Sequence, residues 1–126
     1  MLAASVALAG CGKSEHDKVQ AKVKEFETAI AKKDAKTLCN DVIGPALIEQ
    51  YVAHGITCEQ YWQTGLTGVK SPTLLIGRIV VRGTKASAVV LSGANGQESS
   101  LDAIELVKTG AGWRVSSLGS PVLGKS

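Results

Sequence analysis

The sequence predicts an α+β fold in which N-terminal helices pack on an antiparallel four-stranded β-meander. In the first half, apolar residues recur at helical spacing, as in Val19, Val23, Phe26 and Ile30. After Ser71-Pro72 the pattern changes to short stretches rich in Ile and Val, separated by glycine-rich turns. Helices followed by a meander pack on one face of the sheet, and a chain of 126 residues has room for one domain.

Capping residues divide the helical half into three segments. Ser14 with Asp17 reads as a capping box, Asp34 can cap the second helix, and Thr57 can cap the third with Gln60 as its partner. The second helix should break at Gly44-Pro45, resume, and end at Gly55. The remaining apolar residues assigned to helices are Leu38, Val42 and Ile43, then Leu47, Ile48, Tyr51 and Val52, and finally Tyr61, Trp62 and Leu66.

The second half contains four predicted strands, at residues 74–82, 84–92, 99–107 and 113–118. The separators are short, so consecutive strands should pair in order. Gly110-Ala-Gly112 lies between two of these strands and lacks both a third glycine and a following helix. It is therefore predicted to be a hairpin turn and not a dinucleotide-binding loop.

The segment Leu2 to Gly10 is uncharged, but it is shorter than the roughly 20 apolar residues that a membrane-spanning helix requires. Its length is typical of the apolar part of a secretory signal peptide. Because no basic stretch precedes it, we expect the natural start to lie upstream.

Leu8-Ala9-Gly10-Cys11 resembles the lipobox of bacterial lipoproteins at all four positions. The resemblance implies cleavage after Gly10, a diacylglyceryl group on Cys11, and palmitate-type acyl chains that anchor the protein to the cell membrane or envelope on the extracytoplasmic side. The alternative is an ordinary apolar segment that ends in Cys. The expected organisation is a cleaved signal remnant (1–10), a lipidated tether (11–16), one domain (17–119) and a flexible C-terminal tail (120–126).

Over residues 17–119 the chain looks like a member of the nuclear transport factor 2-like (SnoaL-like) superfamily, in its small bacterial lipoprotein branch. The resemblance rests on three helices followed by a curved sheet, on Ala35 to Cys39, and on Leu106 to Val115. It implies a cone whose sheet wraps around the long helix, often with a pocket at the open end. Isomerases, dehydratases, carriers and non-catalytic interaction modules share this scaffold, so the fold does not settle the function.

Cys39 and Cys58 are predicted to form a disulfide, because an exported domain folds under oxidising conditions and lipidation of Cys11 leaves an even number of cysteines. Two separately buried thiols are the alternative. His16 and His54 do not stand at ligand spacing with either cysteine, so neither a metal site nor a cofactor is predicted.

A catalytic role has one candidate, Asp102. It shares strand parity with Ile104 and Leu106, which should face the helices, and related isomerases use a pocket carboxylate as a base. The alternative is an ordinary exposed or salt-bridged acid. The pocket candidates are Tyr51, Tyr61 and Trp62, which core packing would equally explain. His54, beside the helix-ending Gly55, is expected to cap the helix.

The favoured interpretation is a non-catalytic module that binds a small apolar ligand or an envelope protein; the alternative is an isomerase- or dehydratase-type enzyme. A homodimer through an outer sheet face carrying Leu75, Ile79 and Val81 is a further hypothesis. Nucleic-acid binding is not expected, because the net charge is only +3 and the arginines are dispersed without an aromatic repeat.

Overall fold

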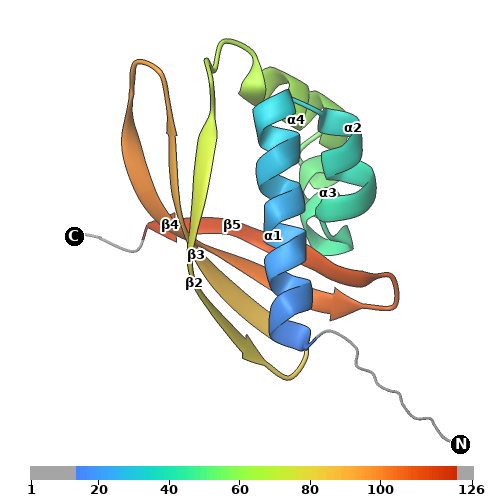
Figure 1. Ribbon diagram of the computed structural model, residues 1–126. Coiled ribbons are helices and arrows are strands. Elements are labelled where there is room, and N and C mark those ends of the chain that lie inside the picture. Colours follow the sequence, from blue (N-terminus) through green and yellow to red (C-terminus); the bar gives the residue numbers. More distant parts are fainter. Residues whose placement is uncertain (1–13, 122–126) are drawn as a thin grey trace, which may run out of the picture.

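The computed structural model describes residues 14–121, and it has the predicted α+β architecture. The helical elements are α1 (Glu15–Lys32), α2 (Ala35–Thr37), the π-helical turn η2 (Leu38–Val42), α3 (Pro45–Ala53) and α4 (Cys58–Leu66). The strands β2 (Thr73–Arg82), β3 (Lys85–Ala94), β4 (Gln97–Thr109) and β5 (Gly112–Pro121) pair antiparallel in the order β2-β3-β4-β5. Figure 1 shows α1 lying along the curved sheet, with the shorter helices grouped beside it.

Each predicted capping residue accepts a backbone hydrogen bond, but among the described residues the reciprocal bond of the predicted Ser14-Asp17 capping box is not formed. The Ser14 hydroxyl accepts a hydrogen bond from the Asp17 amide at 3.1 Å, and Asp34 accepts from the Thr37 amide at 3.1 Å. Thr57 and Gln60 form a complete capping box at the start of α4. Because α1 begins at Glu15, the domain includes residues that the sequence assigned to the tether.

The prediction for the second helix is wrong at the last turn before Gly44. Its α-helical part is only three residues long, and the chain continues as the π-helical turn η2. Ile43 has extended backbone and pairs with Val115 in a parallel bridge, so it does not belong to the helix. The Gly44 amide then donates to the Val115 carbonyl at 2.8 Å, and Pro45 starts α3 at the position where its missing N–H is tolerated.

The hydrophobic core lies between α1 and the inner face of the sheet. All four residues of the predicted α1 stripe are buried. Their counterparts on the strands include Ala88, Val90, Ile104, Leu106 and Val115. Within the described residues no polar or charged residue is buried as a whole, so apolar packing dominates the core.

The predicted outer row of Leu75, Ile79 and Val81 is wrong, because β2 contains a bulge. Ile76 pairs with Val90 and Ile79 pairs with Ala88, so β2 has one extra residue between these pairs. An extra residue reverses the alternation of side chains. Ile79 and Val81 therefore pack against the core, whereas Leu75 stays 60% exposed on the outer face.

The hairpin turn predicted at Gly110-Ala-Gly112 is confirmed, with β5 beginning at Gly112. Strand β4 is longer than predicted, and β5 extends to Pro121, into the segment expected as a tail. The lipobox and Cys11 lie outside the described residues. No helix among residues 14–121 combines the length and the hydropathy needed to cross a bilayer.

Candidate functional site

A cavity of about 390 Å³, here called the cone cleft, opens between α1, α4 and the sheet, at the end of the molecule where α1 ends. Its apolar lining comes from both layers and includes Phe26, Ile30, Trp62, Leu66, Leu74 and Ile104. The α1 residues belong to the same stripe that fills the core, so the cleft is the part of the core that the helices leave open. Such a cavity is large enough for a small organic ligand.

The polar side of the cone cleft is supplied mainly by β4. Glu98, Ser100 and Asp102 occupy alternate positions on that strand and therefore share one face. The Ser100 hydroxyl donates to Asp102 Oδ2 at 2.9 Å. Asp102 lines the cleft together with the buried Ile104, as its strand parity predicted. Within the described structure the cleft lining includes no Lys, Arg or His.

The three predicted pocket aromatics form one continuous cluster but are divided between two cavities. Tyr51 and Tyr61 stack with ring centroids 4.2 Å apart, and Tyr61 meets Trp62 edge to face at 5.4 Å. Trp62 in turn packs edge to face on Phe26 at 6.0 Å. Trp62 lines the cone cleft, whereas Tyr51 and Tyr61 line a neighbouring cavity.

That second cavity, here called the side cleft, has a volume of about 420 Å³ and lies between α3, the start of α4 and β5. Gln50, Tyr51, His54, Tyr61, Ser116 and Ser117 supply its polar and aromatic lining. Its apolar lining includes Leu118, which also lines the cone cleft, so the two cavities adjoin. The sequence indicated neither Gln50 nor the two serines, because no local pattern links α3 to β5.

Two buried polar atoms lie at this aromatic cluster without hydrogen-bond partners in the described structure, the Tyr51 hydroxyl and Trp62 Nε1. Burial, with a smaller contribution from Tyr61, raises the pKa of Tyr51 to about 12. The Trp62 indole N–H lowers the pKa of Tyr51 and so offsets part of this rise. In the described structure it does not form a hydrogen bond with the Tyr51 hydroxyl. The phenol therefore stays protonated at neutral pH and can both donate and accept a hydrogen bond.

His54 caps α3, as predicted, and also lines the side cleft. Its Nδ1 lies 2.8 Å from the Gln50 carbonyl oxygen. A carbonyl oxygen only accepts hydrogen bonds, so Nδ1 must carry the hydrogen. In the neutral imidazole this leaves Nε2 as an acceptor.

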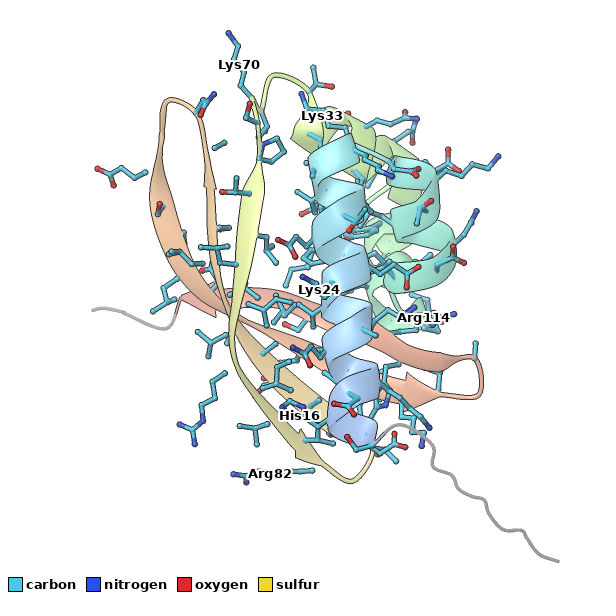
Figure 2. All side chains as sticks on the ribbon, in the orientation of Figure 1. His16, Lys24, Lys33, Lys70, Arg82 and Arg114 are labelled. Atoms are coloured by element: carbon cyan, nitrogen blue, oxygen red, sulfur yellow. A yellow bond between two sulfur atoms is a disulfide. The ribbon has the colours of Figure 1, made fainter. Side chains whose placement is uncertain are left out.

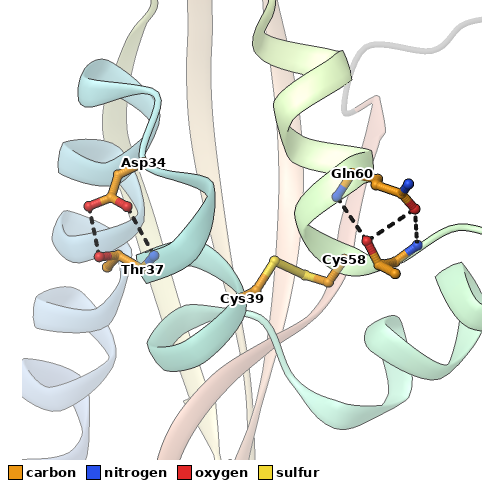
Figure 3. The surroundings of a disulfide bond; sticks show 6 residues. Asp34, Thr37, Cys39, Cys58 and Gln60 are labelled. Atoms are coloured by element: carbon orange, nitrogen blue, oxygen red, sulfur yellow. Dashed lines mark hydrogen bonds between the residues drawn. A yellow bond between two sulfur atoms is a disulfide. The ribbon is translucent and has the colours of Figure 1, made fainter.

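The predicted disulfide between Cys39 and Cys58 is present and joins η2 to the first turn of α4 (Figure 3). In the same view the Asp34–Thr37 cap and the hydrogen bonds of Gln60 lie on either side of it. The cross-link holds α4, which carries Tyr61 and Trp62, against the second helical segment. Disulfides are typical of extracytoplasmic proteins, so this bond indicates such a location. Within residues 14–121 no His, Cys, Asp and Glu side chains gather into a group that could hold a metal ion.

Comparison of the structure with solved structures identifies the fold as nuclear transport factor 2-like. A candidate dehydratase of that family from Streptomyces avermitilis matches with a TM-score of 0.60 and 16% identity, over 87% of this chain and 97% of its own. Kfla4162 from Kribbella flavida matches with a TM-score of 0.63 and 13% identity, over 86% and 91%. A nuclear transport factor 2-like protein of unknown function from Shewanella baltica OS155 matches with a TM-score of 0.57 and 15% identity, over 82% of this chain and 89% of its own.

No protein-family model matches the chain, and no curated protein matches it. At these identities the structural likeness shows the fold and leaves the function to be argued from the site.

Proposed function

We propose that the protein is an exported, lipid-anchored binding module that takes a small apolar ligand into the cone cleft. The observation that carries this proposal is an open cavity of about 390 Å³ whose lining is mainly apolar and in which Asp102 is only partly buried. A catalytic site of the isomerase type would need several buried polar groups that converge on one point. An open apolar cone favours a carrier.

The position of α1 fits an anchor at Cys11. Two residues, Gly12 and Lys13, separate Cys11 from Ser14, and the three residue steps between them span at most about 10 Å. Helix α1 has 18 residues and is therefore about 27 Å long. The cone cleft lies near its far end: in Figure 2, His16 and Arg82 mark the end where α1 begins, and Lys33 and Lys70 mark the opposite end. A lipid on Cys11 would hold the cleft away from the membrane surface, where a ligand can enter.

Ligand binding can be tested with the neutral fluorescent probe N-phenyl-1-naphthylamine. We expect probe fluorescence to rise on binding, and we expect Ala94→Phe, which fills the cone cleft, to weaken binding at least tenfold, or about 1.4 kcal/mol. Ala46→Phe places the same ring on an exposed position of α3 outside the cleft and serves as the control. Native mass spectrometry of protein taken from its own membrane should show a retained small molecule. A protein that retains no small molecule and does not bind the probe would instead favour an envelope-protein partner.

The anchor is tested separately, by Cys11→Ser. The wild type should partition with the membrane fraction and carry the mass of two or more acyl chains, and the variant should lose both properties, because one acyl chain alone binds only marginally. An unchanged mass and unchanged membrane partitioning would refute lipidation while leaving the binding proposal intact.

The second candidate function is an isomerase- or dehydratase-type enzyme, favoured by the inward position of Asp102 and its hydrogen bond from Ser100. If Asp102 is the base, Asp102→Asn should retain unconverted substrate where the wild type retains product; because an isomerase leaves the mass unchanged, the molecules released from the two proteins are compared by NMR. Identical retained molecules in both proteins would argue for the carrier.

A further inference from the structure

We propose that the side cleft binds a neutral carbohydrate, as a mono- or disaccharide unit of a larger glycan. This site is separate from the cone cleft and would take a ligand of different chemistry. Its volume of about 420 Å³ falls within the range of small-ligand sites. The inference rests on three features of the lining, which are its lack of ionic side chains, its free hydrogen-bonding groups and its aromatic surface.

The described side-cleft lining contains no Lys, Arg, Asp or Glu. Beside a neutral His54 imidazole, a charged ligand would lose hydration there without gaining a counter-ion, which is unfavourable. A wholly apolar ligand would in turn cover the polar groups of Gln50, Ser116 and Ser117 and leave them unpaired. A neutral molecule with many hydroxyl groups avoids both penalties.

The hydrogen-bonding groups of the cleft are of the kinds that sugar hydroxyls require. The Gln50 amide offers both donors and an acceptor, the two β5 serines offer hydroxyls, and His54 offers Nε2 because its Nδ1 is occupied by a carbonyl. In the described structure, no hydrogen bond joins any of these side chains to another side chain.

Tyr51 supplies a further indication that something binds here. The residue as a whole is 7% exposed, it lines the cleft, and its hydroxyl has no partner in the described structure. Buried polar groups are nearly always paired, so this hydroxyl calls for a partner that the protein itself does not supply. The hydroxyl oxygen itself is buried, so a ligand hydroxyl pairs with it only after the aromatic cluster opens locally.

The aromatic surface fits the remaining side of a sugar ring. Tyr61 is 40% exposed and stacks on Tyr51, so it forms a broad surface at the cleft. The C–H faces of a pyranose are apolar and can pack against such a ring, while the hydroxyls at its edge reach hydrogen-bonding groups. Aromatic and amide side chains thus serve different parts of one ligand.

The experiment is titration of the full chain with cellobiose and N,N′-diacetylchitobiose as neutral probes, and with glucuronic acid and glucosamine as charged ones, followed by calorimetry and NMR. We expect a neutral disaccharide to bind with a millimolar or better Kd and to shift resonances of α3 and β5. We expect the charged sugars to bind at least about tenfold more weakly. No binding of either disaccharide at tens of millimolar, or shifts confined to the cone cleft, would overturn the proposal.

Two variants separate a binding role of the cleft residues from a structural one. Tyr51→Phe removes only the hydroxyl and should weaken disaccharide binding about fivefold, the equivalent of one hydrogen bond of about 1 kcal/mol. Without sugar it should not lower Tm, because the hydroxyl that it removes is buried and unpaired. Gln50→Leu should also weaken binding, whereas Gln63→Leu, on an exposed position of α4 outside the cleft, should not.

A Tyr51→Phe protein that melts lower yet binds the disaccharide unchanged would show that the hydroxyl is structural, and unchanged binding by Gln50→Leu as well would refute the site. Naphthylamine binding in the cone cleft is measured in parallel on the same protein. Loss of one activity with retention of the other distinguishes failure of this proposal from failure of the apolar-ligand proposal.

Discussion

Trp113 donates its indole N–H to Glu15 Oε1 at 2.9 Å and so joins residues 98 positions apart in the chain. The same oxygen lies 3.0 Å from Lys108 Nζ, and Lys18 Nζ contacts Oε2 at 3.3 Å. These contacts fasten the first turn of α1 to the β4–β5 hairpin. The hydrogen bond from Trp113, with help from that of Lys108, lowers the pKa of Glu15 from its ordinary 4.5 to about 2.

The low pKa of Glu15 predicts a specific loss of stability in acid. The folded protein favours the ionised form of Glu15 more than the unfolded chain does. The contribution of Glu15 to stability is therefore complete above about pH 4.5 and is lost as the pH falls toward about 2. Glu15→Gln should therefore lower Tm at pH 7 and flatten the decline of Tm between these pH values. Thermal melts monitored by circular dichroism across this range check it.

Glu49→Gln, on an exposed position of α3, is the matched control and should keep the wild-type pH profile. Asp34, whose pKa is lowered mainly by the Thr37 amide, should leave a residual acid dependence in both variants. Equal profiles for Glu15→Gln and the wild type would contradict the assigned role of Glu15.

The disulfide should contribute substantially to stability. It closes a loop with a sequence separation of 19, for which chain entropy gives about 3 kcal/mol. The double variant Cys39→Ser/Cys58→Ser should therefore unfold at a Tm lower by roughly 10 °C or more, given the usual scaling for small domains. Differential scanning calorimetry of wild type with and without reductant provides the comparison. If the reduced wild type melts at the same temperature as the oxidised one, the predicted stabilisation by the disulfide is contradicted.

Two glycine-to-alanine changes should have opposite effects. A Cβ at Gly44 would lie 3.0 Å from the Val115 carbonyl oxygen and 3.2 Å from Arg114 Cβ, so Gly44→Ala should destabilise the protein by about 1–3 kcal/mol. A Cβ at Gly65, inside α4, meets nothing within 4 Å, so Gly65→Ala should stabilise by about 0.5–1 kcal/mol. Urea unfolding of both variants measures the two shifts. Shifts of the same sign would show that backbone proximity at β5 does not restrict position 44.

Removal of the α4 cap should have a smaller effect. Thr57→Ala leaves the Gln60 amide without the hydroxyl that it now contacts at 3.1 Å, and such a change costs about 1 kcal/mol. Thr64→Ala, exposed on the same helix, should change stability by less than about 0.5 kcal/mol. A chemical denaturation series distinguishes them, and equal effects would mean that the cap does not hold the helix end.

The features that the sequence predicted correctly are set by neighbouring residues. The caps at Ser14, Asp34 and Thr57 act over three positions, and the hairpin turn at Gly110 depends only on adjacent glycines. The disulfide was predictable for another reason, because compartment and cysteine count restrict the pairing without any knowledge of geometry.

The site was only partly predictable. Strand parity placed Asp102 at the cone cleft, because alternation along one strand is a local property. The side cleft could not be anticipated, since Gln50 and Ser116 meet only after α3 has packed beside β5. The outer row built from Leu75, Ile79 and Val81 failed because a single extra residue in β2 reverses the faces, and only pairing with β3 reveals it.

By itself, then, the sequence determined the α+β class, the strand order, the helix caps and the buried stripe of α1. Each depends on periodicity or on contacts between near neighbours. Tertiary structure decided the bulge in β2 and the π-helical turn before Gly44. It also decided the hydrogen bond from Trp113 to Glu15 and the division of Tyr51 and Trp62 between two cavities. These features arise where segments distant in the sequence pack together, and the free energy of such packing depends on shapes that no local pattern encodes.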